Sequence, residues 1–452
     1  MAESELLTRT DCQAIFARAL RAARALGADD VEVTLGASDS ALTRFANNAI
    51  HQNVSEHRRF LSVRTVVGHR TARASTNRLD DDAVRSVVEE SLAIARSAES
   101  DPELLPMAEP GEVRDANRFF LSTARSTPRD RAEMVAAAIG VAQGASQNAA
   151  GICSAGESAM AILNSRGVFA YYFDTLAQFS ITTMTDDSSG WAKASAPDSS
   201  EVDALALARR AVEKAALSRG PRELAPGRYT VILEPSAVQD LLGQMFFDFS
   251  ATAIHDQRSF LTGRLGQPLF GAGIHIDDDV YHTLQSGPPF DGEGVPRRPL
   301  ALVEGGVPRE VACSRQAARR EGRAPTGHGF PLPNESGEAP LNIVMRGGDQ
   351  SLERMIAGTP RGILVTRLWY IREVDPYEKI MTGMTRDGTF LIEDGGLVCG
   401  VRNFRFNQNL IALLRNVEAL SPAERAAGEE SFDMVAPALK VGDFHFSEVT
   451  KF

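Results

Sequence analysis

The chain has 452 residues, 43% of them hydrophobic and 24% charged, which is typical of a globular protein large enough for two or three domains. The net charge of -11, from 59 acidic and 48 basic side chains, argues against a nucleic-acid partner. No apolar run approaches the roughly 18 residues of a membrane-spanning helix, so we expect no membrane partner. The four cysteines are far apart, and the first thirty residues resemble an amphipathic helix, not a secretory signal; we therefore expect a cytoplasmic protein.

The first half of the chain alternates between helical and strand-like patterns. Apolar residues recur at helical spacing over 10–27, 80–98, 128–147 and 201–218. Two β-rich runs flank the turn residues Asn164 to Gly167, which predicts a hairpin. We expect an α+β domain over residues 1–222, with helices packed on a mainly antiparallel sheet.

The second half begins after the Pro- and Gly-rich link "SRGPRELAPGRYTVILEP". Beyond it, short strands and glycine turns predominate, which favours a β-rich sandwich or barrel-like domain over residues 223–452. The segment 281–299 is too long and too rich in Pro and Gly for a plain connection, and such loops are often functional.

One helix is expected within this β-rich half, over 235–249. Its apolar residues recur at helical spacing, so one face should be buried. Gly243, Gln244 and Asp248 interrupt or flank that apolar face.

The residues alone reveal no complete active site. The eight histidines form no HExxH pattern, and the chain has neither a GxSxG elbow nor a phosphate-binding loop. His275 and the acidic run Asp277 to Asp279 form the densest cluster of possible ligands. Three adjacent aspartates on one strand cannot all face one ion, so we interpret them as a solvated acidic turn.

Several loose motifs in fixed order nevertheless resemble one family. "RSFLTGRLGQPLFGAGIHIDDD", "FDGEGVPRRPLALVEGGV", "PTGHGF" and "RGILVTRLWYIREVDPYEKIMTGMTRDGTFLIEDG" follow one another in the second half, and "LTRFANNAIHQNVSEHRRFLSVRTVVGHRTARASTNRLD" matches in the first. In this order they resemble the TldD/TldE family, also called the PmbA or modulator-of-DNA-gyrase family. The resemblance covers most of the chain.

The resemblance implies a two-domain subunit that dimerises around an enclosed cavity. In TldD-type members this cavity holds a zinc-type metallopeptidase site that cleaves unfolded or linear peptides. Its signature is HExxxH on the helix after a strand ending in Glu-Pro, together with a cysteine nearer the C-terminus.

This sequence departs from that signature. Aligned from Glu234, the two histidines correspond to Gly243 and Asp248, and the glutamate corresponds to Gln244. Glycine has no ligand atom, an amide cannot serve as a general base, and a lone carboxylate holds zinc weakly. The C-terminal region lacks the cysteine. The resemblance is therefore closest to the TldE/PmbA-type subunits, which lack the metal motif and pair with a TldD-type partner.

Three functions remain open. The first is a non-catalytic TldE-like subunit that binds no metal or other cofactor, with a zinc-type metal on its partner. In that case Gln244, Asp248 and His255 are candidates for contacting a peptide, although Gln244 and Asp248 could equally be ordinary residues on the wetter side of the helix. The second is a self-sufficient homodimeric peptide-binding or scaffold protein. The third is a metallopeptidase with an unusual metal site built from Asp248, His255 and His328.

Overall fold

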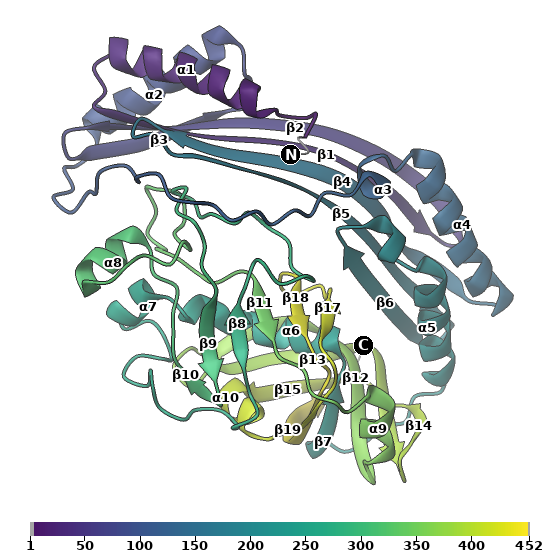
Figure 1. Ribbon diagram of the computed structural model, residues 1–452. Helices are drawn as coiled ribbons and strands as arrows, with labels where there is room; N and C mark the ends of the chain where they lie inside the picture. The colour runs from purple at the N-terminus through teal and green to yellow at the C-terminus, as the bar shows by residue number, and fades with distance from the viewer. Residues whose placement is uncertain (1–3, 451–452) are drawn as a thin grey trace.

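The computed structural model describes residues 4–450 and has the α+β architecture that the sequence predicts (Figure 1). The first half contains one six-stranded antiparallel sheet in the order β3-β2-β1-β4-β5-β6. Its strands are β1 (Asp30–Ala46), β2 (Ala49–Val67), β3 (Arg70–Thr76), β4 (Asn148–Asn164), β5 (Phe169–Met184) and β6 (Ser189–Ala196). The predicted hairpin is confirmed as β4 and β5, with Gly167 in the turn at φ +96°.

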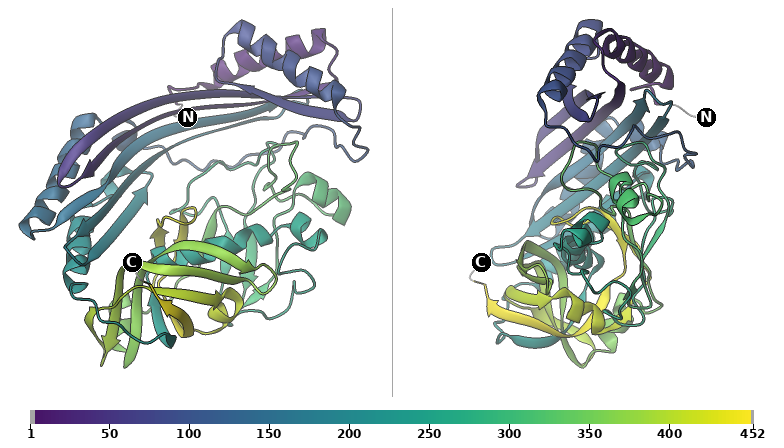
Figure 2. Two further views of the ribbon diagram at one scale, coloured as in Figure 1. Left: turned by 180° about the vertical axis from the view of Figure 1, so that it is seen from behind. Right: turned by 90° about the vertical axis from the view of Figure 1, so that its left-hand side faces the viewer.

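Helices cover the outer face of this sheet near its two ends (Figures 1 and 2). The four predicted helices are confirmed as α1 (Arg9–Ala25), α2 (Asp81–Ser97), α4 (Pro128–Gly144) and α5 (Ala204–Leu217). Two further helices are short, α3 (Leu121–Ala124) and η1 (Ser199–Glu201). Capping boxes begin both α1, with Thr8 and Asp11, and α4, with Thr127 and Asp130. The helices bury apolar strand residues such as Val33 and Phe179 in two separate cores.

The first half is an internal repeat. Each copy runs helix, three strands, helix, and a shift of 118 residues carries the start of β1 at Asp30 onto the start of β4 at Asn148 (148 minus 30). The same shift carries the β1–β2 pair Glu32 and Arg64 onto the β4–β5 pair Ala150 and Thr182. It also carries the β2–β3 pair Leu61 and Thr76 onto the β5–β6 pair Phe179 and Ala194. The two copies therefore have the same strand register and meet at the β1–β4 pair.

The second half contains a closed barrel, in agreement with the predicted barrel-like domain. Pairing runs β12-β7-β19-β15-β13 and returns to β12, so five strands close on themselves, while β14 and β16 extend the sheet. The strands are β7 (Gly227–Leu233), β12 (Arg361–Asp375), β13 (Ile380–Glu393), β14 (Gly396–Gly400), β15 (Phe404–Asn409), β16 (Val417–Leu420) and β19 (Leu439–Val449).

A second sheet of short strands packs beside the barrel in the order β10-β9-β8-β11-β18-β17. Its strands are β8 (Ile276–Asp278), β9 (Leu300–Glu304), β10 (Val307–Pro308), β11 (Ile343–Met345), β17 (Glu424–Ala426) and β18 (Met434–Ala436). The remaining helices are α6 (Pro235–Leu242), η2 (Gly243–Asp248), α7 (Ala251–His255), α8 (Arg315–Glu321), α9 (Leu352–Ala357) and α10 (Leu410–Arg415). α6 and η2 contribute many side chains to the largest core of the molecule.

The long sheet arches over the second half, which lies against its inner, concave face (Figure 2). The two halves touch at β6, where Lys193 Nζ donates to the carbonyl of Gly428 and Ser195 donates to Asp433. The chain crosses between them in the link from α5 to β7, which contains the expected boundary after residue 222. No helix within residues 4–450 has both the length and the apolar character that crossing a membrane requires.

The prediction of one continuous helix over 235–249 is wrong. The α-helix ends at Leu242, and the chain continues as a 3₁₀ turn over Gly243–Asp248 before a second short helix. The apolar residues are buried as expected. Glycine is a poor helix former, however, and Asp248 at the end of the 3₁₀ turn forms the ion pair with Lys379 described below.

Candidate functional site

The site begins at Glu234, the residue before α6. Pro235 occupies the first helical position, where its missing N–H costs nothing. The buried Glu234 carboxylate lies 2.5 Å from Arg210 Nη2 and 2.7 Å from Lys214 Nζ, both from α5. Burial raises the pKa of Glu234, but the two cations outweigh it and hold that pKa below its ordinary value. This ion cluster ties the start of α6 to the first half of the molecule.

Gly243 is the residue that the sequence alignment from Glu234 sets against the first histidine of HExxxH. It is buried, and a Cβ added to it would lie 1.8 Å from the Ser431 hydroxyl oxygen and 2.4 Å from the Ser431 Cβ. Real Cβ atoms do not approach other atoms so closely, so Ser431 occupies the space that a side chain at 243 would need.

Gln244, which the same alignment sets against the glutamate, is bound to the loop that contains Ser431. Its Nε2 donates to the Glu430 carbonyl at 3.0 Å. Gln239 of α6 holds the loop further: its Nε2 donates to the carbonyls of Ser431 and Phe432, at 2.8 and 3.0 Å. We call residues 428–432 the plug loop, because they fill the side of the helix on which the motif residues would lie.

Asp240 of α6 also holds the plug loop. One of its carboxylate oxygens accepts the N–H groups of Glu429 and Glu430, both at 2.9 Å, and the other accepts Leu368 N at 3.3 Å. Burial raises the pKa of Asp240 to about 6, against the lowering effect of these donors.

Asp248, which the alignment sets against the second histidine, is an ion-pair partner of Lys379. It is bonded to the Lys379 ammonium and accepts Phe260 N at 3.2 Å. Lys379, itself buried, also lies 2.6 Å from Glu373. Burial raises the pKa of Asp248, and the Lys379 charge opposes that rise. The carboxylate oxygens of Asp248 are therefore engaged by groups of the same chain.

The two histidines proposed for an unusual metal site with Asp248 do not form one with it. His255 ends α7 with an exposed side chain. His328 is buried, with its two ring nitrogens 2.9 Å from Asp278 and 3.0 Å from the Thr326 hydroxyl. Among residues 4–450, no three His, Cys, Asp or Glu side chains gather closely enough to hold a metal ion.

The interpretation of Asp277 to Asp279 as a solvated turn is wrong for Asp278. This residue lies in strand β8, is 1% exposed, and accepts the N–H groups of Leu341 and Asn342 in addition to its contact with His328. His328 and the two amides satisfy its charge, which is why it can be buried. It supports the fold of the second sheet.

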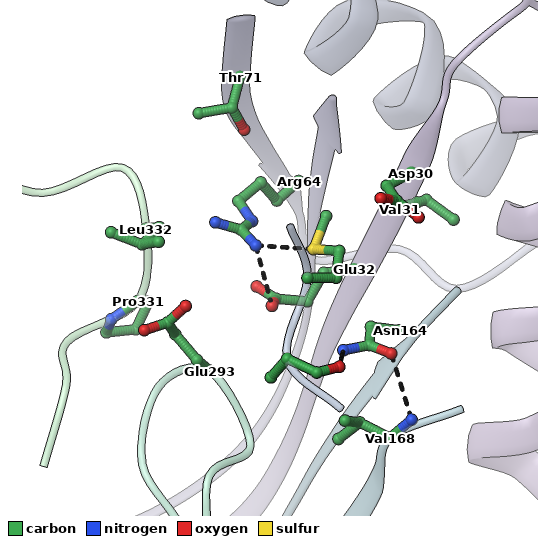
Figure 3. A network of polar contacts seen from close by, with 12 residues as sticks. Asp30, Val31, Glu32, Arg64, Thr71, Asn164, Val168, Glu293, Pro331 and Leu332 are labelled. Carbon is green, nitrogen blue, oxygen red and sulfur yellow. Dashed lines mark hydrogen bonds and ion pairs between the residues drawn. The ribbon is translucent and has the colours of Figure 1, made fainter. Parts of the chain in front are cut away.

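A buried polar cluster also joins the inner face of the long sheet to loops of the second half (Figure 3). Glu32 lies 3.4 Å from Arg64 and 2.6 Å from Arg73, and Arg73 Nε donates to the carbonyl of Leu332. On the loop side, Glu293 pairs with Arg315 at 2.8 Å. The 281–299 loop, expected to be functional, also joins the halves, because Arg118 Nε donates to the Gln285 carbonyl and Gly287 N donates to the Tyr172 hydroxyl.

The residues that fill the site come from distant segments, and sequence reasoning missed them. Gln244 and Glu430 are 186 residues apart, and Lys379 and Asp248 are 131 apart. No local spacing announces such pairs. The resemblance to a known motif located Gly243, Gln244 and Asp248, but no pattern pointed to Ser431 or Lys379.

Comparison with known proteins is consistent with this architecture. The model for the PmbA/TldA metallopeptidase C-terminal domain matches residues 226–448, that for metallopeptidase domain 1 matches 31–95, and that for the central domain matches 122–219. These matches define the class, a protein related to metallopeptidases. The chain belongs to the TldD/TldE family, also called the PmbA family.

Solved structures share the whole fold. TldE from Thermococcus kodakarensis superposes with a TM-score of 0.86 at 20% identity, covering 96% of this chain and 99% of its own. A protein described as a modulator of DNA gyrase from Thermotoga maritima gives 0.84 at 20% identity, with 96% and 100% covered. A similarly described protein from Bacteroides thetaiotaomicron gives 0.83 at 22% identity, with 98% and 100% covered. At these identities the likeness establishes the fold alone.

Two curated relatives match over part of their length. One, from Methanocaldococcus jannaschii and without an assigned function, is 30% identical over 199 residues, which are 42% of this chain and 46% of the relative. The other, a metalloprotease of Methanothermobacter thermautotrophicus, is 25% identical over 285 residues, 58% of this chain and 60% of the relative. The match thus spans about half the length of these relatives.

Proposed function

We propose that this chain is a non-catalytic, TldE-like subunit of a two-subunit metallopeptidase that cleaves unfolded or linear peptides. In this assembly the zinc-type metal belongs to a TldD-type partner with an intact HExxxH motif. One observation carries the proposal. At all three motif positions, groups of the same chain fill or engage the place that a metal site would need.

The chemistry of a peptidase metal site explains why this observation matters. Such a site needs three protein ligands and a base for the attacking water. Gly243 offers no ligand atom, and Ser431 fills the space beside it. Gln244 has an amide in place of a base, and Asp248 is already paired with Lys379. These residues do not fit a bound metal, so we derive no catalytic step through one on this chain.

The three residues proposed for peptide contact differ in how accessible they are to a peptide. Asp248 is buried in its ion pair, and Gln244 is bonded to the plug loop. Of the three, only His255 is exposed. Gln244→Ala should therefore leave peptide cleavage by an assembled pair unchanged. A clear loss of cleavage with intact assembly would show that Gln244 contacts the peptide.

Co-expression tests the assembly itself. We would produce the chain alone, its HExxxH-bearing homologue from the same genome alone, and both together, and assay each sample on an unstructured peptide. The proposal expects a stable complex, metal in proportion to the homologue only, and full cleavage only when both chains are present. Cleavage by this chain alone would overturn it. A stable homodimer that ignores the homologue would favour the scaffold function instead.

A further inference from the structure

Strand β2 has a long edge that the chain leaves unpaired. β2 pairs with β1 along its length, but β3 covers its other side only from Leu61 to Val67. From Gln52 to Phe60 every side chain is exposed except the partly buried Val54. Within residues 4–450, no backbone hydrogen bond reaches the outer side of this stretch. We call Gln52–Phe60 the open edge.

The internal repeat provides a direct reference for this edge. The shift of 118 residues places the open edge on residues 170–178 of β5, and β6 likewise leaves the start of that stretch uncovered. There, however, the segment before α3 covers the edge at its centre: Arg118 forms a parallel bridge with Asp174, and Thr175 N donates to the Arg118 carbonyl at 3.1 Å. The same structural position is thus closed by the chain in one repeat and open in the other.

The open edge lacks several of the features that usually prevent strand addition. Natural edge strands are protected by proline, charged side chains (lysine above all), bulges or short length. The stretch "QNVSEHRRF" contains no proline or lysine, and its register with β1 is unbroken from Gln52 onward. Its charged residues Glu56, Arg58 and Arg59 are of both signs, so a partner strand must place opposite charges against them. Unpaired backbone groups on such an edge bind best to another extended strand.

We propose that the occupant is the same edge of a second copy of this chain, paired antiparallel across a two-fold axis at His57. An antiparallel pair centred there sets Glu56 opposite Arg58 of the second copy, and Val54 opposite its Phe60. Both pairs occur twice because of the symmetry. Glu56 and Arg58 lie on the inner face with side chains that are 46% and 73% exposed, and they already pair with each other within the chain.

Charge and geometry select this register. Moving the axis by one residue, to Glu56, would set two glutamates directly opposite each other, which is unfavourable. The start of β3 opposite Leu61 ends the available edge at Phe60, so an axis at His57 pairs the edge as far as its last free residue. The proposal is independent of the peptidase function, because it uses no residue of α6, η2 or the plug loop.

Sedimentation velocity on charge variants of the full chain tests the proposal. The wild type should be a dimer at about 100 µM. Glu56→Arg and Arg58→Glu should each weaken the dimer at least about tenfold, because each sets like charges opposite each other twice. The double variant Glu56→Arg/Arg58→Glu should restore it. Glu133→Arg, an exposed ion-pair reversal on α4, is the matched control and should change nothing.

The other outcomes overturn the proposal. A monomeric wild type, a dimer that ignores both single variants, or a double variant that stays dissociated would each exclude this pairing. If the wild type is monomeric alone and both single variants lose a co-expressed HExxxH-bearing homologue, the edge serves that partner and not a second copy. Circular dichroism on every variant confirms that the fold is intact, as expected for exposed side chains.

Discussion

The α6 region and the open edge of β2 differ in whether the chain's own residues occupy them. Around α6 the chain uses its own residues to close the space: Ser431 lies against Gly243, and Lys379 pairs with Asp248. Along β2 the chain leaves a regular row of backbone donors and acceptors uncovered. The closed region lies in the largest core, where any unpaired polar group would be costly, whereas the open edge lies in water.

The difference indicates which region can bind another molecule. Around α6 the polar groups are already bonded within the chain, so they stabilise the fold and are not available to a ligand. An edge whose repeat equivalent is closed, but which is itself open, retains its capacity to bind. The predictions below test each side of this contrast, beginning with the closed region.

The largest effect is expected from Lys379→Met. Removing the cation leaves the Asp248 carboxylate buried without its partner, which costs about 3–5 kcal/mol in the free energy of unfolding at neutral pH. Urea unfolding measures it. Arg258→Met, which removes an exposed pair with Asp256, is the control and should cost at most about 1 kcal/mol. The double variant Lys379→Met/Asp248→Asn should recover most of the loss; if it does not, the ion pair is not what closes this region.

The plug loop should make stability depend on pH through Asp240. Its pKa is raised to about 6 in the folded chain, from an ordinary value of 3.8. The stabilising contribution of Asp240 is fully present below pH of about 4 and is lost as the pH rises through about 6. Between these pH values the carboxyl is ionised in the unfolded chain but protonated in the folded one. Relative to Asp240→Asn, the wild type should therefore lose up to about 3 kcal/mol of unfolding free energy between pH 4 and pH 7.

Unfolding curves at several pH values check this shift. Asp115→Asn, at an exposed aspartate, is the control and should follow the wild type at every pH. A constant difference between wild type and Asp240→Asn would mean that this carboxyl ionises as freely in the folded chain as in the unfolded one. The plug loop would then be held by its other contacts.

A smaller effect, with a change of sign, is expected at Gly243. Gly243 has an ordinary helical backbone, so Gly243→Ala alone would favour the helix by about 1 kcal/mol. The Cβ would clash with Ser431, however, and overpacking of this kind costs about 1–3 kcal/mol. We expect net destabilisation in the wild-type background and a neutral or stabilising effect in Ser431→Gly. Thermal unfolding of the wild type, Gly243→Ala, Ser431→Gly and the double variant measures how the two substitutions couple in the free energy of unfolding. If the two effects simply add, Ser431 does not fill the space beside residue 243.

Local patterns were sufficient for much of the fold. The helix α2 follows from buried residues at helical spacing, including Val84, Val88 and Leu92. The β4–β5 hairpin follows from its turn residues. The break at Gly243 could not be predicted, because the apolar spacing continues through it and the residues that contact this segment, Lys379 and Ser431, lie far away in the sequence.

The repeat and the open edge also lay beyond the sequence reasoning. The two copies resemble each other in sequence only over short stretches, among them Asp39-Ser40-Ala41 with Glu157-Ser158-Ala159 and residues 61–66 with residues 179–184. Their equivalence is a matter of register, which depends on pairing between strands and not on residue identity. Whether an edge is open or closed depends on where a connecting segment lies, and that is fixed by tertiary contacts such as Arg118 with the carbonyl of Gln285.

The finest test compares single amides at equivalent positions of the two repeats. Thr175 N is bonded to the Arg118 carbonyl, and the repeat shift makes His57 its equivalent on the open edge. In dilute solution the His57 amide should exchange with deuterium about a hundredfold faster than the Thr175 amide, because its outward N–H has no partner to break from. At concentrations that favour the paired edge, the His57 amide should become protected while Thr175 stays unchanged. Equal exchange of both amides at every concentration would show that the two edges do not differ.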